Sequence, residues 1–185
     1  MKLHLSTEPP DVPKHKCLAL GIFVDEKPPR GICGFIDWRL NGLISREIKR
    51  EKISGEFAEK AILPFPQRIG AEYLLLFGMG KLARFNAEKI HDAAYQLVAA
   101  VDGMLMDEFS FELPGENRIS LDTAGIAEAM VTGFFDYLSQ HAEKLRKMTS
   151  CLVTSPAQVK DVSTGIKNFK ANVKDLGTVK VSFKK

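Results

Sequence analysis

The sequence predicts a three-layer α/β domain with a mostly parallel or mixed sheet. Apolar runs of strand length alternate along the chain with segments of helical periodicity, which is typical of this class. No internal repeat or long linker divides the 185 residues, and this length is sufficient for one hydrophobic core. We therefore expect residues 1–185 to form a single domain.

The first half of the chain supplies four strand signals and one helical signal. Leu3 and Leu5 alternate with polar residues, as in a half-buried strand, and residues 17–24 form a continuous apolar run expected of a central strand. Apolar residues then recur at helical spacing over 32–48. The runs 59–65 and 71–78 are separated only by Pro-Gln-Arg-Ile-Gly, which predicts a hairpin or neighbouring strands.

The second half repeats the alternation. Asn86 is a suitable N-cap for a helix from Ala87 to about Leu105, and Phe109 to Leu113 forms the next predicted strand. A further long helix is expected to begin after Asp122 or Thr123. Residues 151–155 predict a strand, Ser155-Pro156 the cap and first turn of a last helix, and 178–183 an edge strand. Eight side chains are predicted to be buried: Leu20, Ile22, Leu75, Phe77, Leu97, Val98, Met130 and Phe134.

Composition and charge narrow the functional classes. Hydrophobic residues make up 45% and charged residues 26% of the chain, and the net charge is +3. The lysines of the last part of the chain are dispersed, which favours a solvated surface over a nucleic-acid-binding arm. No apolar run approaches the ~20 residues that span a membrane, and no signal peptide is evident. Cys17, Cys33 and Cys151 form no CxxC pair, so we expect small buried thiols in a reduced, cytoplasmic protein.

The order of these segments resembles a known family. "CLALGIFVDEKPPRGICGFIDWRLNGLISREIKREKISGEFAEKAILPF" followed by "RIGAEYLLLFGMGKLARFNAEKIHDAAYQLVAAV" is similar to the N-terminal domain of the leucyl aminopeptidases. The resemblance rests on the Gly-rich turn Ile53-Ser54-Gly55-Glu56, the segment Gly78-Met79-Gly80-Lys81 and the helix that follows Asn86. It implies a macro-domain-like fold, and some macro domains bind ADP-ribose.

The resemblance does not extend to catalytic motifs. In that family the domain precedes a catalytic domain whose two metal ions are held by a Lys/Asp/Glu set and an Asn-Thr-Asp-Ala-Glu-Gly-Arg segment. Neither occurs in this sequence, and Asp122-Thr123-Ala124-Gly125 lacks the adjacent Glu and Arg. The resemblance thus implies a stand-alone domain without aminopeptidase activity.

One segment is a candidate binding site. Gly78-Met79-Gly80-Lys81 follows a predicted strand and precedes a helix, where backbone N–H groups can receive an anion. We interpret it mainly as a structural turn, with a weak phosphate site at Gly78, Gly80, Lys81 and Asn86 as the alternative. The four histidines show no metal-ligand spacing, so no metal or cofactor is expected. Phe35 and Trp38 are interpreted as core or interface residues.

Two functions remain open. The chain is expected to be a protein-interaction or oligomerisation module that associates with itself or with a full-length aminopeptidase. The alternative is a macro-type module that binds a nucleotide or an ADP-ribose-like phosphate. No nucleic acid or membrane partner is expected.

Overall fold

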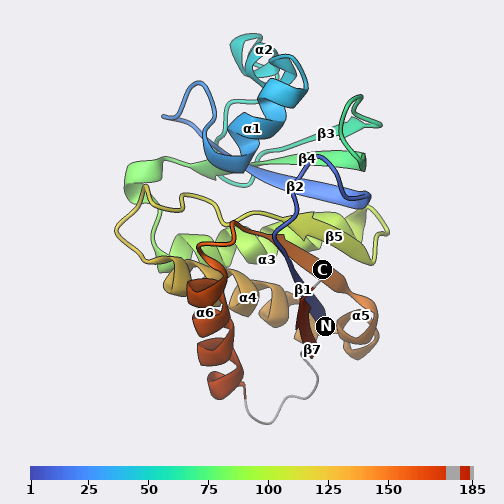
Figure 1. The fold of residues 1–185 in the computed structure, drawn as a ribbon, viewed down its shortest axis with the longest axis vertical. Coiled ribbons are helices and arrows are strands. Elements are labelled where there is room, and N and C mark those ends of the chain that lie inside the picture. Colours follow the sequence, from blue (N-terminus) through green and yellow to red (C-terminus); the bar gives the residue numbers. More distant parts are fainter. Residues whose placement is uncertain (174–179, 184–185) are drawn as a thin grey trace.

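The computed structural model describes residues 1–173 and 180–183, which form a sheet with helices on both faces (Figure 1). The strand order is β3-β4-β2-β5-β6-β1-β7, and every neighbouring pair is parallel except β3 and β4. The predicted three-layer α/β class is confirmed. The strands are β1 (Lys2–Ser6), β2 (His15–Phe23), β3 (Lys60–Pro64), β4 (Ala71–Gly80), β5 (Glu108–Phe111), β6 (Thr149–Val153) and β7 (Lys180–Phe183).

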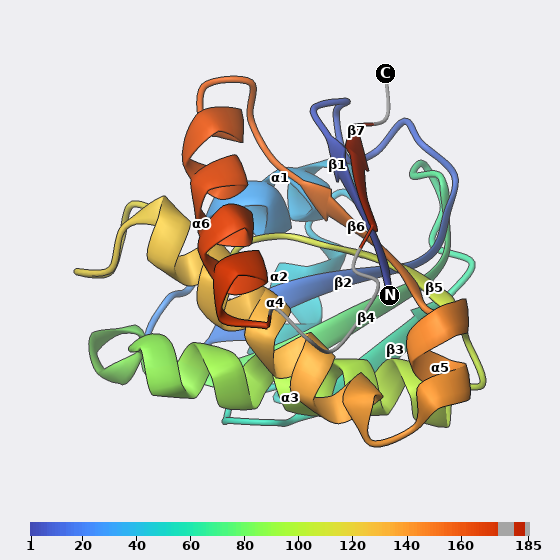
Figure 2. The ribbon, with the colours of Figure 1, turned by 90° about the horizontal axis from the view of Figure 1, so that it is seen from below.

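The helices divide between the two faces of the sheet. Helices α1 (Gly31–Arg39) and α2 (Leu43–Lys49) cover one face, over β2 and β4. Helices α3 (Ala87–Gly103), α4 (Thr123–Ser139) and α6 (Val159–Asn172) cover the other face, as Figures 1 and 2 show. A short 3-10 helix, η1 (Leu82–Arg84), precedes α3, and α5 (Ala142–Lys147) leads into β6. None of the helices in the described residues is long and apolar enough to cross a membrane.

The core reflects the burial of the central strands on both faces. Along β4, Leu74 and Leu76 pack toward α1 and α2, whereas Leu75 and Phe77 pack toward the α3 side. This arrangement explains the continuous apolar run in place of an alternating one. All eight side chains predicted to be buried are at most 2% exposed.

The hairpin and most caps were predicted correctly. Strands β3 and β4 pair antiparallel, with Ile62 opposite Leu75. The Asn86 side chain accepts a hydrogen bond from the Lys89 N–H, and Asp122 accepts one from the Gly125 N–H, so each caps its helix. The three cysteines are buried, as expected. Strand β7 is an edge strand of the sheet, while residues 178 and 179 of its predicted range lie outside the described residues.

Three predicted helix boundaries differ from the structure. The helix expected over 32–48 is two helices, because Asn41 and Gly42 adopt positive φ values of 55° and 71° and break it. The Asp37 carboxylate then accepts a hydrogen bond from the Ser45 N–H in the first turn of α2. Ser155 does not cap the last helix. Its hydroxyl donates to Gln158 Oε1 at 2.6 Å, and α6 begins at Val159. Helix α3 ends at Gly103, before Leu105, whose φ is also positive.

Candidate functional site

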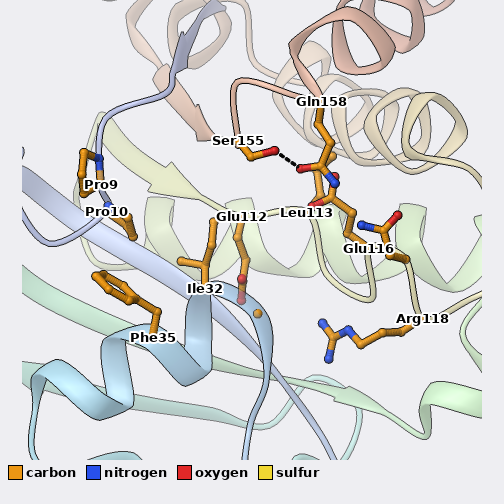
Figure 3. Close-up of a pocket in the computed structure, with 12 residues that line it drawn as sticks. Pro9, Pro10, Ile32, Phe35, Glu112, Leu113, Glu116, Arg118, Ser155 and Gln158 are labelled. Carbon is orange, nitrogen blue, oxygen red and sulfur yellow. Dashed lines mark hydrogen bonds between the residues drawn. The ribbon is translucent and has the colours of Figure 1, made fainter.

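A crevice lies at the carboxyl ends of the parallel strands, where two adjacent strands lead to helices on opposite faces of the sheet. Strand β2 leads to α1 on one face, whereas the adjacent strand β5 leads to α4 on the other face. Ligands of open α/β sheets bind at such switch points. The crevice measures about 460 Å³ (Figure 3). It is lined by the loop after β1 (Pro9, Pro10), the start of α1 (Gly31, Ile32, Phe35), the segment after β5 (Glu112, Leu113, Glu116, Asn117, Arg118) and the segment before α6 (Ser155, Gln158).

Glu112 directly follows β5 and is the most buried charged residue of the crevice, with 7% of its surface exposed. Its Oε1 accepts a hydrogen bond from the Gly21 N–H at 3.1 Å. Burial raises the pKa of Glu112 to about 8, although the N–H groups of Gly21 and Cys33 and the charge of Arg118 act in the opposite direction. This carboxyl group is therefore mostly protonated at neutral pH.

Arg118 joins two loops across one side of the crevice. Its Nη1 donates to Glu26 Oε2, on the loop between β2 and α1, and its guanidinium lies 5.6 Å from the centre of the Phe23 ring. The Arg118 and Glu26 side chains are 20% and 10% exposed, so solvent only partly screens this pair. Burial also raises the pKa of Glu116, which is hydrogen bonded to Gln158 and Thr123.

Gly31 leaves the crevice wall open where these side chains meet. Its φ is +64°, and a Cβ at this position would lie 3.6 Å from Arg118 Nη2 and 3.9 Å from Glu112 Oε2. Figure 3 shows the Glu112 carboxyl and the Arg118 guanidinium extending from the same segment into this region. A side chain at residue 31 would be strained and would occupy the space in front of both groups.

Aromatic rings flank the opening. Phe35 lines the crevice and is 38% exposed, and its ring centre lies 6.1 Å from that of Trp38. Trp38 is 69% exposed, so it is not a core residue, and the alternative interpretation of Phe35 and Trp38 as interface residues stays a prediction. Arg39 next to it forms an ion pair with Asp11, which attaches the loop after β1 to α1.

The Gly78-Met79-Gly80-Lys81 segment does not line this crevice. Gly78 and Gly80 lie at the carboxyl end of β4. The Gly78 N–H donates to the Glu59 carbonyl oxygen at 2.8 Å, and the Gly80 N–H donates to the Gly55 carbonyl oxygen at 2.9 Å. A Cβ at Gly78 would lie 1.9 Å from the Glu56 carbonyl oxygen, so glycine is needed for the close approach of the 55–59 segment. The packing of the 55–59 segment against the end of β4 thus explains the glycines in structural terms.

The two other residues of that predicted site lie nearby at the start of η1 and α3. Lys81 is exposed, and Asn86 is the cap of α3. The Leu82 N–H donates to Asp25 Oδ1 at 2.9 Å, which lowers the pKa of Asp25. Ligand binding at these four residues stays a prediction.

The sequence reading missed Glu112, Glu116 and Arg118. Their signal is their position. Glu112 lies near the end of the predicted strand Phe109 to Leu113, Glu116 and Arg118 follow this strand, and the corresponding strand β5 pairs with the central strand β2. Among the described residues, no group of three or more His, Cys, Asp or Glu side chains is arranged to hold a metal ion.

The fold and the crevice together define a macrodomain-like α/β domain. The chain is similar to a mutant macrodomain of Oceanobacillus iheyensis, with a TM-score of 0.69, 10% identity and coverage of 92% of both chains. It is also similar to the Trypanosoma brucei macrodomain in complex with ADP-ribose, with a TM-score of 0.66 and 12% identity over 83% of this chain and 64% of that one. At these identities the likeness shows the fold alone.

Residues 19–143 match the family model described as the cytosol aminopeptidase family, N-terminal domain. The chain belongs to this family. A probable cytosol aminopeptidase of Burkholderia orbicola is 34% identical over 110 residues, which are 58% of this chain and 22% of the relative. The chain therefore spans about a fifth of the length of such relatives. A mutant tomato leucine aminopeptidase has the same fold over 83% of this chain and 33% of its own, with a TM-score of 0.51 and 18% identity.

Proposed function

We propose that this chain is a noncatalytic module that binds a small polar ligand in the switch-point crevice. The observation that carries the proposal is the convergence of Glu112, Arg118 and the open wall at Gly31 in a crevice of about 460 Å³. Small-molecule sites combine a largely apolar, preformed concavity with a few polar groups that orient the ligand. Ile32, Phe35 and Leu113 supply the apolar part of this lining.

The macrodomain neighbours suggest the first ligands to test. Structures of the Trypanosoma brucei macrodomain contain ADP-ribose or ADP, so a nucleotide or an ADP-ribose-like phosphate is a reasonable starting class. We infer no catalysis, because the two catalytic motifs of the aminopeptidases do not occur in this sequence. The name of the curated relatives and the three buried cysteines favour a cytoplasmic protein.

The test is an NMR titration of the 15N-labelled chain with ADP-ribose, ADP and adenosine. We expect saturable amide shifts at Gly31, Ile32 and Leu113. The variant Ile32→Trp fills the crevice and should abolish the shifts, whereas Ile62→Trp, on exposed β3, should retain them. Binding that persists in Ile32→Trp, or that moves only Gly78, Gly80 and Lys81, would place the ligand elsewhere.

A second candidate function is a protein contact through the exposed α1 face. Phe35 and Trp38 form an exposed ring pair on α1, and the ion pair between Arg39 and Asp11 attaches the loop after β1 to this helix. Such residues are enriched in protein interfaces. The proposed partners are a second copy of the chain or a full-length aminopeptidase. Sedimentation velocity of the wild type and of Trp38→Ser tests self-association, and equal masses at all concentrations would contradict it.

A further inference from the structure

Strand β3 leaves one edge of the sheet open. It is the outermost strand at one end of the strand order, and among the described residues β4 is its only strand partner (Figure 1). None of its five residues is buried, and Ile62 at its centre is 48% exposed. An edge strand of this kind presents a row of unpaired N–H and C=O groups that can pair with another strand.

Hydrogen bonds at both ends of β3 show which backbone groups face the open edge. The Phe65 N–H donates to the Glu72 carbonyl oxygen at 2.7 Å, and the Gly78 N–H donates to the Glu59 carbonyl oxygen at 2.8 Å. In an antiparallel ladder, alternate residues direct their backbone groups to the same neighbour. The odd-numbered residues from 59 to 65 thus face β4, and the backbone groups of the three even-numbered residues between them face outward.

The open edge is complementary to itself. The outward residues Lys60, Ile62 and Pro64 offer two N–H donors and three carbonyl acceptors, because proline has no N–H. A second copy of the strand, antiparallel about a two-fold axis at Ile62, overlaps all five residues. Ile62 then exchanges two hydrogen bonds with its copy, and each Lys60 N–H donates to the Pro64 carbonyl oxygen of the other chain. Every outward N–H is satisfied, and only the Lys60 carbonyl oxygen is left to solvent.

Lysine and proline often protect sheet edges against pairing, but neither blocks this arrangement. Lys60 Nζ lies 5.9 Å from the centre of the Phe77 ring on β4, so this side chain turns back over the sheet. In the two-fold arrangement each Lys60 lies opposite Pro64 of the other chain, so like charges do not face each other. The half-exposed Ile62 side chains meet at the axis, where both lose apolar surface to water.

We propose that β3 is a self-association edge, through which two copies of this chain pair antiparallel at Ile62 and join their sheets into one. A two-fold contact of this kind closes on itself and yields a dimer. The inference goes beyond the proposed ligand binding, since Ile62 does not line the crevice. It assigns self-association to β3 and leaves the α1 face to the full-length aminopeptidase, the other partner proposed for that face.

Disulfide trapping tests the register. In Ile62→Cys the two introduced residues face each other at a Cα separation of about 5.5 Å, within the range of about 4.4–6.8 Å that a disulfide spans. The three native cysteines are buried, so the introduced thiol is the accessible one. With copper phenanthroline, covalent dimer should form about tenfold faster than in the control Leu105→Cys, because pairing raises the effective concentration of the thiols. Leu105 is 95% exposed, so equal rates would report random collision and overturn the proposal.

Amide hydrogen exchange tests the pairing itself in the wild-type chain. Raising the protein concentration from about 10 μM to about 1 mM should slow exchange of the Lys60 and Ile62 N–H groups about fivefold, because dimerisation follows mass action. Exchange of the Leu63 N–H, which faces β4, should stay unchanged. Unchanged exchange at Lys60 and Ile62 contradicts the proposal, even if the chain dimerises.

Surface variants separate β3 from the α1 face. Ile62→Lys places two lysines opposite each other and should stay monomeric in sedimentation velocity, whereas the control Leu105→Lys should associate like wild type. Because Ile62 is half-exposed, far-UV circular dichroism should show an unchanged fold in Ile62→Lys. Trp38→Ser should retain association, since Trp38 lies on α1. Association that persists in Ile62→Lys, or is lost in Trp38→Ser, would assign the contact to another surface and overturn the proposal.

Discussion

Replacing Gly78 with Ala should measurably destabilise the domain. The added methyl group would lie 1.9 Å from the Glu56 carbonyl oxygen and 3.0 Å from the Gly55 carbonyl carbon, both of which are backbone atoms that cannot move aside alone. The 55–59 segment must therefore shift as a unit.

The shift would affect a defined set of hydrogen bonds. Gly78 exchanges backbone hydrogen bonds with Glu59 and Ala58 at 2.8 and 2.9 Å. Glu59 Oε2 accepts from the Ser54 N–H, the Ser54 hydroxyl and the Gly55 N–H, each at 2.8 Å. Overpacking costs about 1–3 kcal/mol and each lost hydrogen bond about 0.5–1.5 kcal/mol. With partial relaxation, we expect a loss of about 3 kcal/mol in the free energy of unfolding.

Urea unfolding followed by far-UV circular dichroism measures this loss. Gly103→Ala is the matched control, because a Cβ at Gly103, the last residue of α3, meets no atom within 4 Å. That control should be neutral or stabilising by up to about 1 kcal/mol. A change below about 0.5 kcal/mol for Gly78→Ala would refute the close approach of the 55–59 segment to β4.

The remaining predictions concern the core, a carboxyl group and catalysis. Leu75→Ala should lower the free energy of unfolding by about 2–5 kcal/mol, since Leu75 is fully buried, and a neutral result in urea unfolding would contradict its place in β4. Burial raises the pKa of Glu112 from 4.5 to about 8, so its contribution to stability is full below pH 4.5 and is lost as pH rises toward 8. Glu112→Gln should therefore show a smaller fall in stability between pH 5 and 8 than wild type, and parallel curves would exclude this effect. The purified chain should not hydrolyse leucyl p-nitroanilide with Zn²⁺ or Mn²⁺, and metal-dependent cleavage that co-elutes with the chain would disprove this expectation.

The sequence predicted the layers of the fold because its strongest patterns report burial. The continuous apolar runs that became β2 and β4 are buried on both faces, and Asn86 and Asp122 act as caps through local hydrogen bonds. The break between α1 and α2 was missed because helical spacing of apolar residues continues across Gly42, while the positive φ of Gly42 and the cap from Asp37 interrupt the backbone.

The crevice was harder to predict because its residues are far apart in the chain. Gly31, Glu112 and Gln158 meet only when β2, β5 and β6 lie side by side in the sheet. Periodicity identifies strands but does not give their order. The Gly78 segment attracted attention because its glycines are close together in sequence, yet those glycines are explained by the 55–59 backbone.

The position of β1 has a consequence for how the domain assembles. Its two neighbours are β6 and β7, so Lys2 pairs with Thr149 on one side and Lys180 on the other. During synthesis β1 is made before either neighbour, while β2, β3 and β4 can already associate with one another. Contacts of such large sequence separation slow folding, because a long loop must close before they contribute. Strand β1 therefore remains unpaired, and prone to aggregation, until most of the domain has been translated. It enters the sheet in one of the last steps.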